Sequence, residues 1–188
     1  MPNPGLHLAI EIDGDGAHPA AWRRAAHAPD HLLTSHRVRS VAAVVENSGF
    51  TLATVDDDLL PPDDRPHPVG RIGAVERAAF IAAATSTLGV VPTVSTTYTE
   101  PFHVSSQLAS IDHISVGRAG WLVSESVAAE AARAWGRPHV ENTRREARDS
   151  TRVVRDLWDS WEDDAVIRDV ATSRYLDRDR LHYIDFVG

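Results

Sequence analysis

Carboxylate and hydroxyl side chains gather where two apolar runs end. Asp56-Asp57-Asp58 follows the run Thr51–Val55, and hydroxyl side chains are frequent from Thr93 to Thr99, where the run Gly89–Ser95 ends. A carboxylate at the carboxyl end of a parallel strand stands where α/β folds place their sites, although a solvated acidic loop would also account for it. A structural turn rarely needs so many hydroxyl groups. Asp56 and the hydroxyl run are therefore candidate site residues.

Two patterns typical of metal sites are weak. Asp13-Gly14-Asp15-Gly16 alternates carboxylates as calcium loops do, but Arg24 stands at the twelfth position, where such a loop needs a bidentate Glu. His27 and His31 are four residues apart and could share a helical face toward a metal. In a chain with 10 histidines such a pair is expected by chance, and a solvated helix face is the preferred interpretation. We expect no metal site.

The composition excludes several classes of function. The chain has no cysteine, which removes thiol nucleophiles, redox dithiols, disulfides and cysteine-based zinc sites. It has no lysine, which removes a Schiff-base amine and a P-loop lysine. Its formal net charge of −8 disfavours nucleic acid and anionic membrane surfaces as partners. The start lacks a signal-peptide pattern and no run is long enough to span a bilayer, so we expect a cytoplasmic protein.

The positioning elements alternate between strand and helix. Helical spacing begins near Ser35 and stops at Asn47-Ser48-Gly49, and three further helices are expected over about 72–87, from Pro101, and over about 144–161. Before them stand four strand-like runs: Leu6–Ile12, Thr51–Val55, Gly89–Ser95 and Trp121–Val123. Four such alternations predict an α/β fold with a parallel sheet and right-handed crossovers. The tail His182–Gly188 alternates like a half-buried strand. We treat residues 1–188 as a single domain.

Five motifs in order resemble the bacterial luciferase-like flavin monooxygenases, and most closely the branch of nitrilotriacetate and dibenzothiophene-sulfone monooxygenases. The resemblance runs from about Leu6 to Gly188. The motifs are His18–Arg23, Thr96–His103, Leu108–Ser115, Gly117–Trp121 and Leu157–Ala165.

This resemblance implies the N-terminal half of a (β/α)8 barrel: a partial TIM-type barrel of about four parallel β/α units with a C-terminal extra strand or hairpin. It implies reduced FMN, delivered by a separate flavin reductase, and O2 as reactants. The flavin C4a-hydroperoxide would transfer one oxygen atom to a small organic substrate. Asp56, Thr96 and Tyr98 would bind the cofactor, and His18 would act on the substrate side as a hydrogen-bond donor or proton carrier.

The sequence departs from the family pattern at three points. Leu122 stands where the family commonly has Asn, and Thr143-Arg144 stands where the branch often has Arg-Tyr. The chain is also shorter than a complete barrel, which needs about 250 residues. A half barrel exposes two parallel sheet edges. We therefore expect a homodimer, a complementary barrel half, or a fragment of a longer product.

Two alternatives keep the fold. One is a non-catalytic half barrel that dimerises or binds flavin without turnover, which the departures at Leu122 and Arg144 favour. The other exchanges FMN for a deazaflavin and makes the protein an oxidoreductase of that class. His18, Asp56 and Thr96 favour the monooxygenase.

Overall fold

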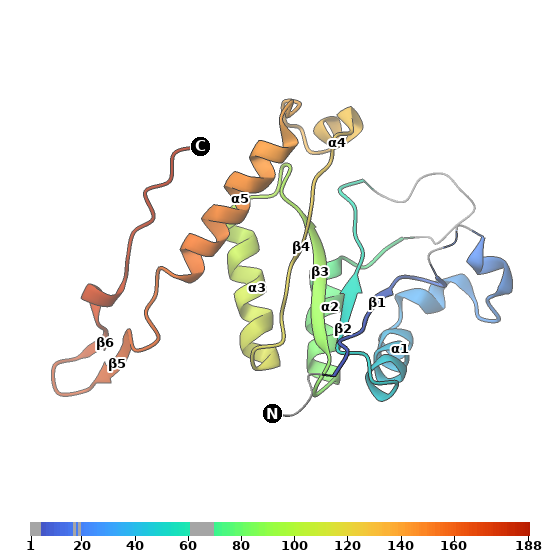
Figure 1. Cartoon of the computed structure of the whole chain (residues 1–188), viewed down its shortest axis with the longest axis horizontal. Coiled ribbons are helices and arrows are strands. Elements are labelled where there is room, and N and C mark those ends of the chain that lie inside the picture. Colours follow the sequence, from blue (N-terminus) through green and yellow to red (C-terminus); the bar gives the residue numbers. More distant parts are fainter. Residues whose placement is uncertain (1–4, 17, 19, 61–69) are drawn as a thin grey trace.

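A four-stranded parallel sheet organises the chain in the computed structural model, which describes residues 5–16, 18, 20–60 and 70–188. The strands follow one another across the sheet in chain order (Figure 1). They are β1 (Ala9–Ile12), β2 (Leu52–Val55), β3 (Gly89–Ser95) and β4 (Leu122–Ser124). The parallel register aligns Ile12 with Val55 and Val55 with Pro92, so the strands end at one edge of the sheet. The expectation of four consecutive parallel β/α units is confirmed.

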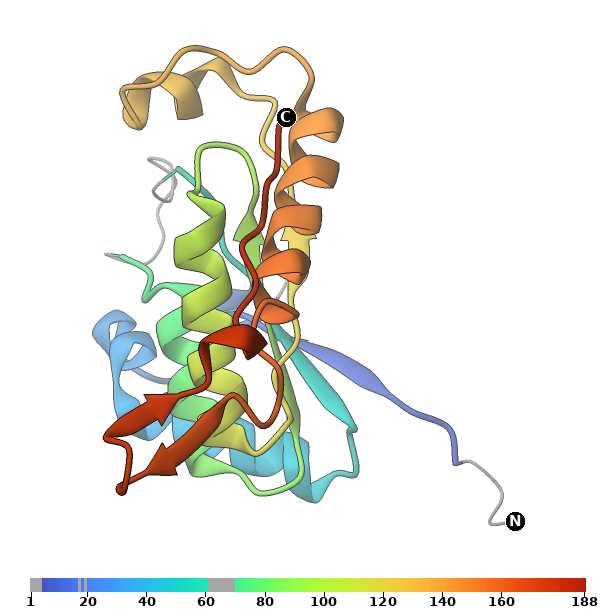
Figure 2. The same cartoon turned by 90° about the vertical axis from the view of Figure 1, so that its left-hand side faces the viewer.

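Helices cover one face of this sheet. They are α1 (Ser35–Asn47), α2 (Ala74–Ala84), α3 (Pro101–Ser115) and α5 (Thr143–Trp158), with the short α4 (Ala129–Ala134) before α5. Figure 2 shows α1, α2 and α3 on the same side, while α5 packs beside α3 next to β4. The opposite face of the sheet carries no helix in either view. This is the arrangement of one part of a barrel wall, with its inner face open.

The core lies between the sheet and the helices because alternate strand residues point to the helical side. Small residues of α2 let this helix approach β2 and β3 closely. The buried residues here are Ala42, Val45, Ala53, Val55, Ala74, Ala78, Ile81, Ala82, Leu88, Val90 and Ile111. A second, smaller cluster joins α3 to α5 through Val104, Leu108 and Val154, with Trp121 packed against it.

Side-chain caps fix where the helices begin. Thr34 accepts a hydrogen bond from the backbone N–H of Arg37 at the start of α1, and Asn142 does the same for Arg145 at the start of α5. At the start of α3, the carboxylate of Glu100 accepts from Phe102 and His103 N–H groups, and Pro101 occupies the first turn. Each cap satisfies N–H groups that have no partner within the helix.

The loop Gly117-Arg118-Ala119-Gly120 leads into β4. The contacts of two of its residues, Gly120 and Arg118, explain why these residue types stand there. A Cβ at Gly120 would lie 3.0 Å from Val91, so only glycine fits against β3 without a shift of that side chain. The Arg118 guanidinium donates to the carbonyls of Ala82 and Thr85 at the end of α2 and to that of Leu88, directly before β3. Arg118 thereby supplies donors to terminal carbonyls that the helix itself leaves unpaired.

The predicted tail strand over 182–188 is wrong. These residues form no strand, and Tyr183 and Val187 are almost fully exposed. The extra hairpin instead lies before them, as β5 (Val166–Asp169) and β6 (Arg174–Leu176), and projects from the end of α5 (Figure 1). The tail runs back along α5, where Phe186 packs beside Arg152. An alternating pattern forms a strand only beside another strand, and here Phe186 lies beside a helix instead.

Smaller differences concern element bounds. Helix α2 spans Ala74–Ala84 rather than 72–87, α5 ends at Trp158 rather than 161, and β1 begins at Ala9 rather than Leu6. Helix α4 was not expected. The proline-rich loop predicted between the second strand and the second helix falls largely on residues 61–69, outside the described residues. Within the described part of the chain, no helix combines the length and the apolar character needed to cross a bilayer.

Candidate functional site

The four predicted site residues all follow carboxyl ends of neighbouring strands. His18 comes after β1, Asp56 directly after β2, and Thr96 and Tyr98 directly after β3. Because the strands are parallel and adjacent, their following loops leave the sheet at the same edge. This is the edge at which parallel α/β folds and barrels place their sites. The topology therefore brings the loops that carry these residues to one edge of the sheet.

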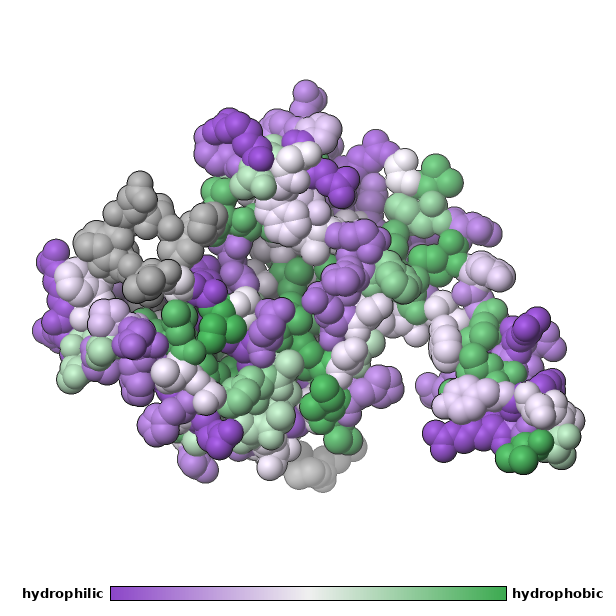
Figure 3. Space-filling view, turned by 180° about the vertical axis from the view of Figure 1, so that it is seen from behind, coloured by the Kyte–Doolittle hydropathy of each residue, from purple (hydrophilic) through white to green (hydrophobic). Residues whose placement is uncertain are grey.

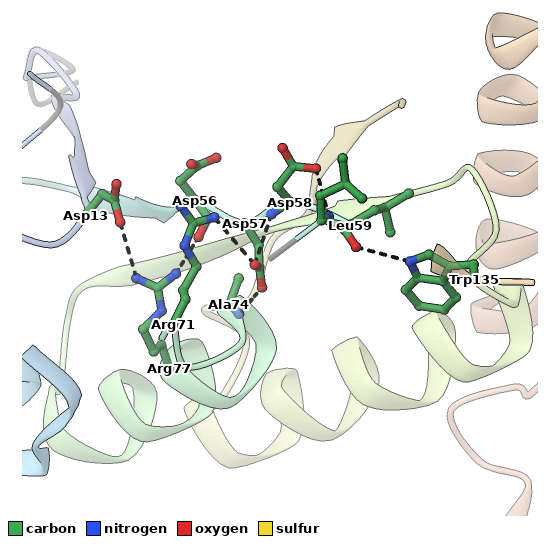
Figure 4. A network of polar contacts seen from close by, with 10 residues as sticks. Asp13, Asp56, Asp57, Asp58, Leu59, Arg71, Ala74, Arg77 and Trp135 are labelled. Carbon is green, nitrogen blue, oxygen red and sulfur yellow. Dashed lines mark hydrogen bonds and ion pairs between the residues drawn. The ribbon is translucent and has the colours of Figure 1, made fainter. Parts of the chain in front are cut away.

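The three aspartates after β2 have different surroundings. The carboxylate of Asp57 accepts a hydrogen bond from the backbone N–H of Ala74 at 2.6 Å and so serves the beginning of α2. Its other oxygen accepts from the N–H of Asp58 at 2.9 Å. The carboxylate of Asp56 points away from α2 (Figure 4). It makes no hydrogen bond or ion pair among the described residues, although its charge acts on Arg77. Asp57 thus positions the beginning of α2, whereas the half-buried carboxylate of Asp56 keeps free acceptor capacity.

Arg77 joins the loops after β1 and β2, a role that sequence reasoning missed. Its guanidinium donates to the main-chain carbonyl of Asp56 and lies 3.9 Å from the carboxylate of Asp13 (Figure 4). Its side chain is only 11% exposed. Burial lowers the pKa of Arg77, while the neighbouring carboxylates of Asp13 and Asp57 act in the opposite direction. A buried cation of this kind is held by its acceptors.

His18 is exposed, and one of its ring nitrogens is already committed. Nδ1 accepts a hydrogen bond from the backbone N–H of Ala20 at 3.0 Å. A nitrogen that accepts carries no proton, so the proton of the neutral ring is on Nε2. His18 therefore offers an N–H donor at Nε2, which is the property that a hydrogen-bond donor or proton carrier requires.

The hydroxyls after β3 mostly hold neighbouring loops. Thr96 is buried and donates to the carbonyl of Ser124 at 3.1 Å, while Thr97 accepts from the N–H of Ser126. The Tyr98 hydroxyl accepts from the N–H of Val140 at 3.3 Å, and Tyr98 itself has a φ of 74°. A positive φ is costly for a bulky residue and is kept only where the surroundings enforce it. These contacts connect the loop after β3 to the segment between β4 and α5.

The open face of the sheet is apolar with hydroxyl groups. Strand alternation places Thr54, Val91 and Thr93 on this face, and register pairs Thr93 with Leu122, which is 43% exposed. Thr93 is buried, and its hydroxyl oxygen has no hydrogen-bond partner among the described residues. Leu122, the position of a departure from the family pattern, thus lies on the wall that a ligand at this edge would meet.

The histidine pair considered for metal binding is not on a solvated helix face, so that expectation is wrong. His27 lies outside a helix, and its two ring nitrogens contact the carboxylate of Asp15 at 2.7 Å and the carbonyl of Ala28 at 2.9 Å. These acceptors raise the pKa of His27, with the carbonyl contact the larger cause. His31 lies in a short 3-10 helix with its ring 5.4 Å from that of His27. No group of three potential metal ligands occurs among the described residues.

A cleft lies between α3 and the end of α5, away from the carboxyl edge of the sheet. Figure 3 shows a recess between the body and the arm formed by the β5–β6 hairpin. The cleft has a volume of about 660 Å³, and its lining includes Phe102, Leu108, Trp158 and Trp161. The side chains of Trp158 and Trp161 are 41% and 53% exposed, so neither tryptophan belongs to the core.

Comparisons with known proteins agree with the barrel-wall geometry. The model of the luciferase-like monooxygenase family matches residues 15–176. The chain belongs to this family. Nitrilotriacetate monooxygenase component A of Aminobacter aminovorans is 42% identical over 99% of this chain and 45% of its own length. Dibenzothiophene-sulfone monooxygenase of Rhodococcus erythropolis (strain XP) is 32% identical over 97% of this chain and 44% of its own.

The solved structures place the fold in the same way. A riboflavin lyase, solved with modified FMN and riboflavin as substrate, matches with a TM-score of 0.81 and 29% identity, over 97% of this chain and 44% of that one. The family resemblance and the partial TIM-type barrel are therefore confirmed. The chain spans less than half the length of the relatives that it matches.

Proposed function

We propose that this chain is the N-terminal half of an FMN-dependent monooxygenase that inserts one atom of O2 into a small organic substrate. The observation that carries the proposal is the family match over residues 15–176, which includes His18, Asp56, Thr96 and Tyr98 at the carboxyl edge of the sheet. The names of the relatives, among them a nitrilotriacetate and a dibenzothiophene-sulfone monooxygenase, support the reaction class and small-molecule substrates.

The residues present fit the ring part of a flavin better than its phosphate. The open face offers apolar and hydroxyl side chains such as Val91, Thr54 and Leu122, against which a planar ring can pack. The Asp56 carboxylate can accept a hydrogen bond from a ring N–H. A phosphate needs cations or several free N–H groups, and the guanidinium of Arg77 is already surrounded by carboxylates. We therefore propose that this chain holds the ring and that the complementary half holds the phosphate.

Each proposed site residue has a separate task. Bound reduced flavin would supply the electrons with which O2 reacts, so that one oxygen atom enters the substrate and the other leaves as water. Asp56 and Thr96 would orient the ring, and Tyr98 would fix the loop between them and β4. His18 would donate a hydrogen bond or a proton from Nε2 to the substrate side. The apolar wall would keep water away from the ring.

The sheet edges define the partners that the proposal needs. Among the described residues, β1 and β4 each have one neighbouring strand, so their outer N–H and C=O groups are open to a partner strand. We propose that a complementary barrel half, or a second copy in a homodimer, covers these edges. A flavin reductase is the proposed source of reduced FMN. A cytoplasmic location and a single domain over residues 1–188 stay predictions.

A non-catalytic flavin-binding or dimerising half barrel is the second candidate. The side chain of Leu122 favours it, because an apolar group cannot hydrogen-bond to a flavin edge at this point of the wall. Arg144, at the start of α5, likewise lacks the aromatic hydroxyl expected from the branch. The deazaflavin alternative has no support among the relatives reported above.

Flavin titration tests the proposal. The purified chain is titrated with FMN and, separately, with riboflavin, and flavin fluorescence is recorded. We expect binding at tens of micromolar, with affinities for the two ligands equal within about threefold, because this chain would contact only the ring that they share. Asp56→Asn should weaken both, whereas Asp163→Asn, at an exposed position beyond α5, should change neither. The absence of binding by the chain would remove the support for a flavin site in this half.

A further inference from the structure

The loop after β2 is held at three points, two of them from α2 and one from the residue that follows α4. Arg77 of α2 donates to the carbonyl of Asp56, and the start of α2 donates from Ala74 to the carboxylate of Asp57. Beyond α4, the indole N–H of Trp135 donates to the carbonyl of Leu59 at 3.2 Å. Figure 4 shows these contacts in a row along the loop. The loop is therefore fixed although it lies outside any helix or strand.

Of these three anchors, Arg77 acts directly on the residue whose carboxylate faces outward. Its guanidinium binds the Asp56 carbonyl from the helical side, which leaves the Asp56 side chain to point away from α2 (Figure 4). The same guanidinium faces Asp13, one residue beyond β1, in the loop that leads to His18. One buried cation thus contacts the first residues of two loops that carry proposed site residues.

We propose that Arg77 is a positioning residue that sets the direction of the Asp56 carboxylate and links it to the loop after β1. This role rests on the proposed function for the part that concerns flavin, since Asp56 is the group that would meet the ring. A lysine could not reproduce it fully, because one ammonium group lacks the planar fork that reaches both loops. Arg71 provides a matched comparison, because it lies 3.7 Å from Asp57 and is 28% exposed.

Amide hydrogen exchange of the chain without ligand tests the positioning itself. The N–H groups of Asp58 and Leu60 donate to the carboxylates of Asp57 and Asp58, so their exchange reports the order of this loop. In Arg77→Met, exchange over 56–60 should become about tenfold faster or more, since a hydrogen bond from a charged group is lost. Arg77→Lys should fall between this variant and the wild type, and Arg71→Met should change exchange less than Arg77→Lys.

A merely structural role would give a different pattern. It would accelerate exchange throughout the chain, including α5, which packs against α3 and β4. A general acceleration, or unchanged exchange over 56–60 in Arg77→Met, would overturn the proposal. If Arg77→Met does not fold, amide exchange over 56–60 is compared in Arg77→Lys and Arg71→Lys. Exchange should then be faster in Arg77→Lys, and equal exchange in the two variants would overturn the proposal.

A double-mutant cycle with flavin tests whether Arg77 acts through Asp56. Arg77→Met and Asp56→Asn should each weaken riboflavin binding by about tenfold, and the double variant should be no weaker than Asp56→Asn alone. Independent, multiplied losses would show that Arg77 does not act through Asp56. If the wild type fails to bind riboflavin, the proposed flavin site fails, while the exchange pattern still decides whether Arg77 fixes the loop.

Discussion

At the residue scale, existing hydrogen bonds decide what each polar side chain at the strand ends can still do. Nδ1 of His18 accepts from Ala20, which leaves Nε2 as a donor. Asp57 is engaged at the start of α2, whereas the Asp56 carboxylate is directed away from it. The Thr96 hydroxyl donates its hydrogen bond to the Ser124 carbonyl, so toward a ligand it can only accept. The remaining hydrogen-bonding capacity is thus a donor at His18 and acceptors at Asp56 and Thr96.

The donor role of His18 predicts the effect of replacing it. In a complete version of the protein, His18→Ala should lower kcat by about a hundredfold, the usual scale for a proton-transferring group, while flavin affinity changes little. Steady-state kinetics and flavin titration measure the two quantities. His103→Ala, an exposed histidine on α3, is the control and should leave both unchanged. Unchanged kcat in His18→Ala would remove this residue from the mechanism.

At the element scale, a carboxylate joins the end of α1 to the connection between α2 and β3. One oxygen of Glu46 lies within 2.7 to 3.2 Å of the N–H groups of Ser86, Thr87 and Leu88. The hydrogen bond from Thr87 is the largest cause of the lowered pKa of Glu46. These bonds satisfy N–H groups in a loop and position the beginning of β3.

The stability of this connection should depend on pH. A carboxylate whose pKa is lower in the folded state stabilises above its unfolded-state pKa, near 4.5, and loses this contribution as pH falls through the folded-state value. At pH 7, Glu46→Gln should lower the free energy of unfolding by about 1 kcal/mol. Denaturant unfolding should show this difference shrink below about pH 4.5, while Glu141→Gln, at an exposed position, shows no such difference. A difference that is the same at pH 7 and pH 3 would contradict the assignment.

The sequence predicted the elements where apolar periodicity and packing agree. Strand β3 and the beginnings of α1 and α3 have the predicted bounds, because Pro101 and the apolar spacing act locally. The strand predicted over 182–188 was wrong, since strand formation depends on a neighbouring strand that no local pattern specifies. Arg77 was missed for a similar reason. Its role depends on which carbonyl from a distant loop reaches it, and a single arginine in an alanine-rich helix does not reveal that.

At the scale of the whole molecule, the sheet has one open face and two open edges, and these surfaces determine how the chain associates. Exposed apolar residues at the β4 side include Leu122, Val123 and Val127, at 43%, 40% and 73%. Parallel sheets are normally covered on both faces, and an exposed edge is a template for a further strand. We infer that the chain associates through this side.

Light scattering measures this association. At about 100 μM, a concentration high enough to populate weak complexes, the mass should exceed the 20.5 kDa of one chain and fall on dilution. Leu122→Lys should shift the mass toward the monomer, because a charge on an edge strand disfavours pairing. Arg137→Lys, at an exposed position beyond α4, serves as the comparison. A stable monomer at this concentration would count against open edges that need a partner.

The order β1-β2-β3-β4 also has a consequence for how the protein is made. Each new strand joins the one that left the ribosome just before it, so no segment waits for a distant part of the chain before it can dock. Contacts between consecutive units favour rapid, stepwise folding during synthesis. In a nascent chain arrested after α3, the amides of β1, β2 and β3 should already be protected from hydrogen exchange. The edge of β3 is then available for pairing with the next strand.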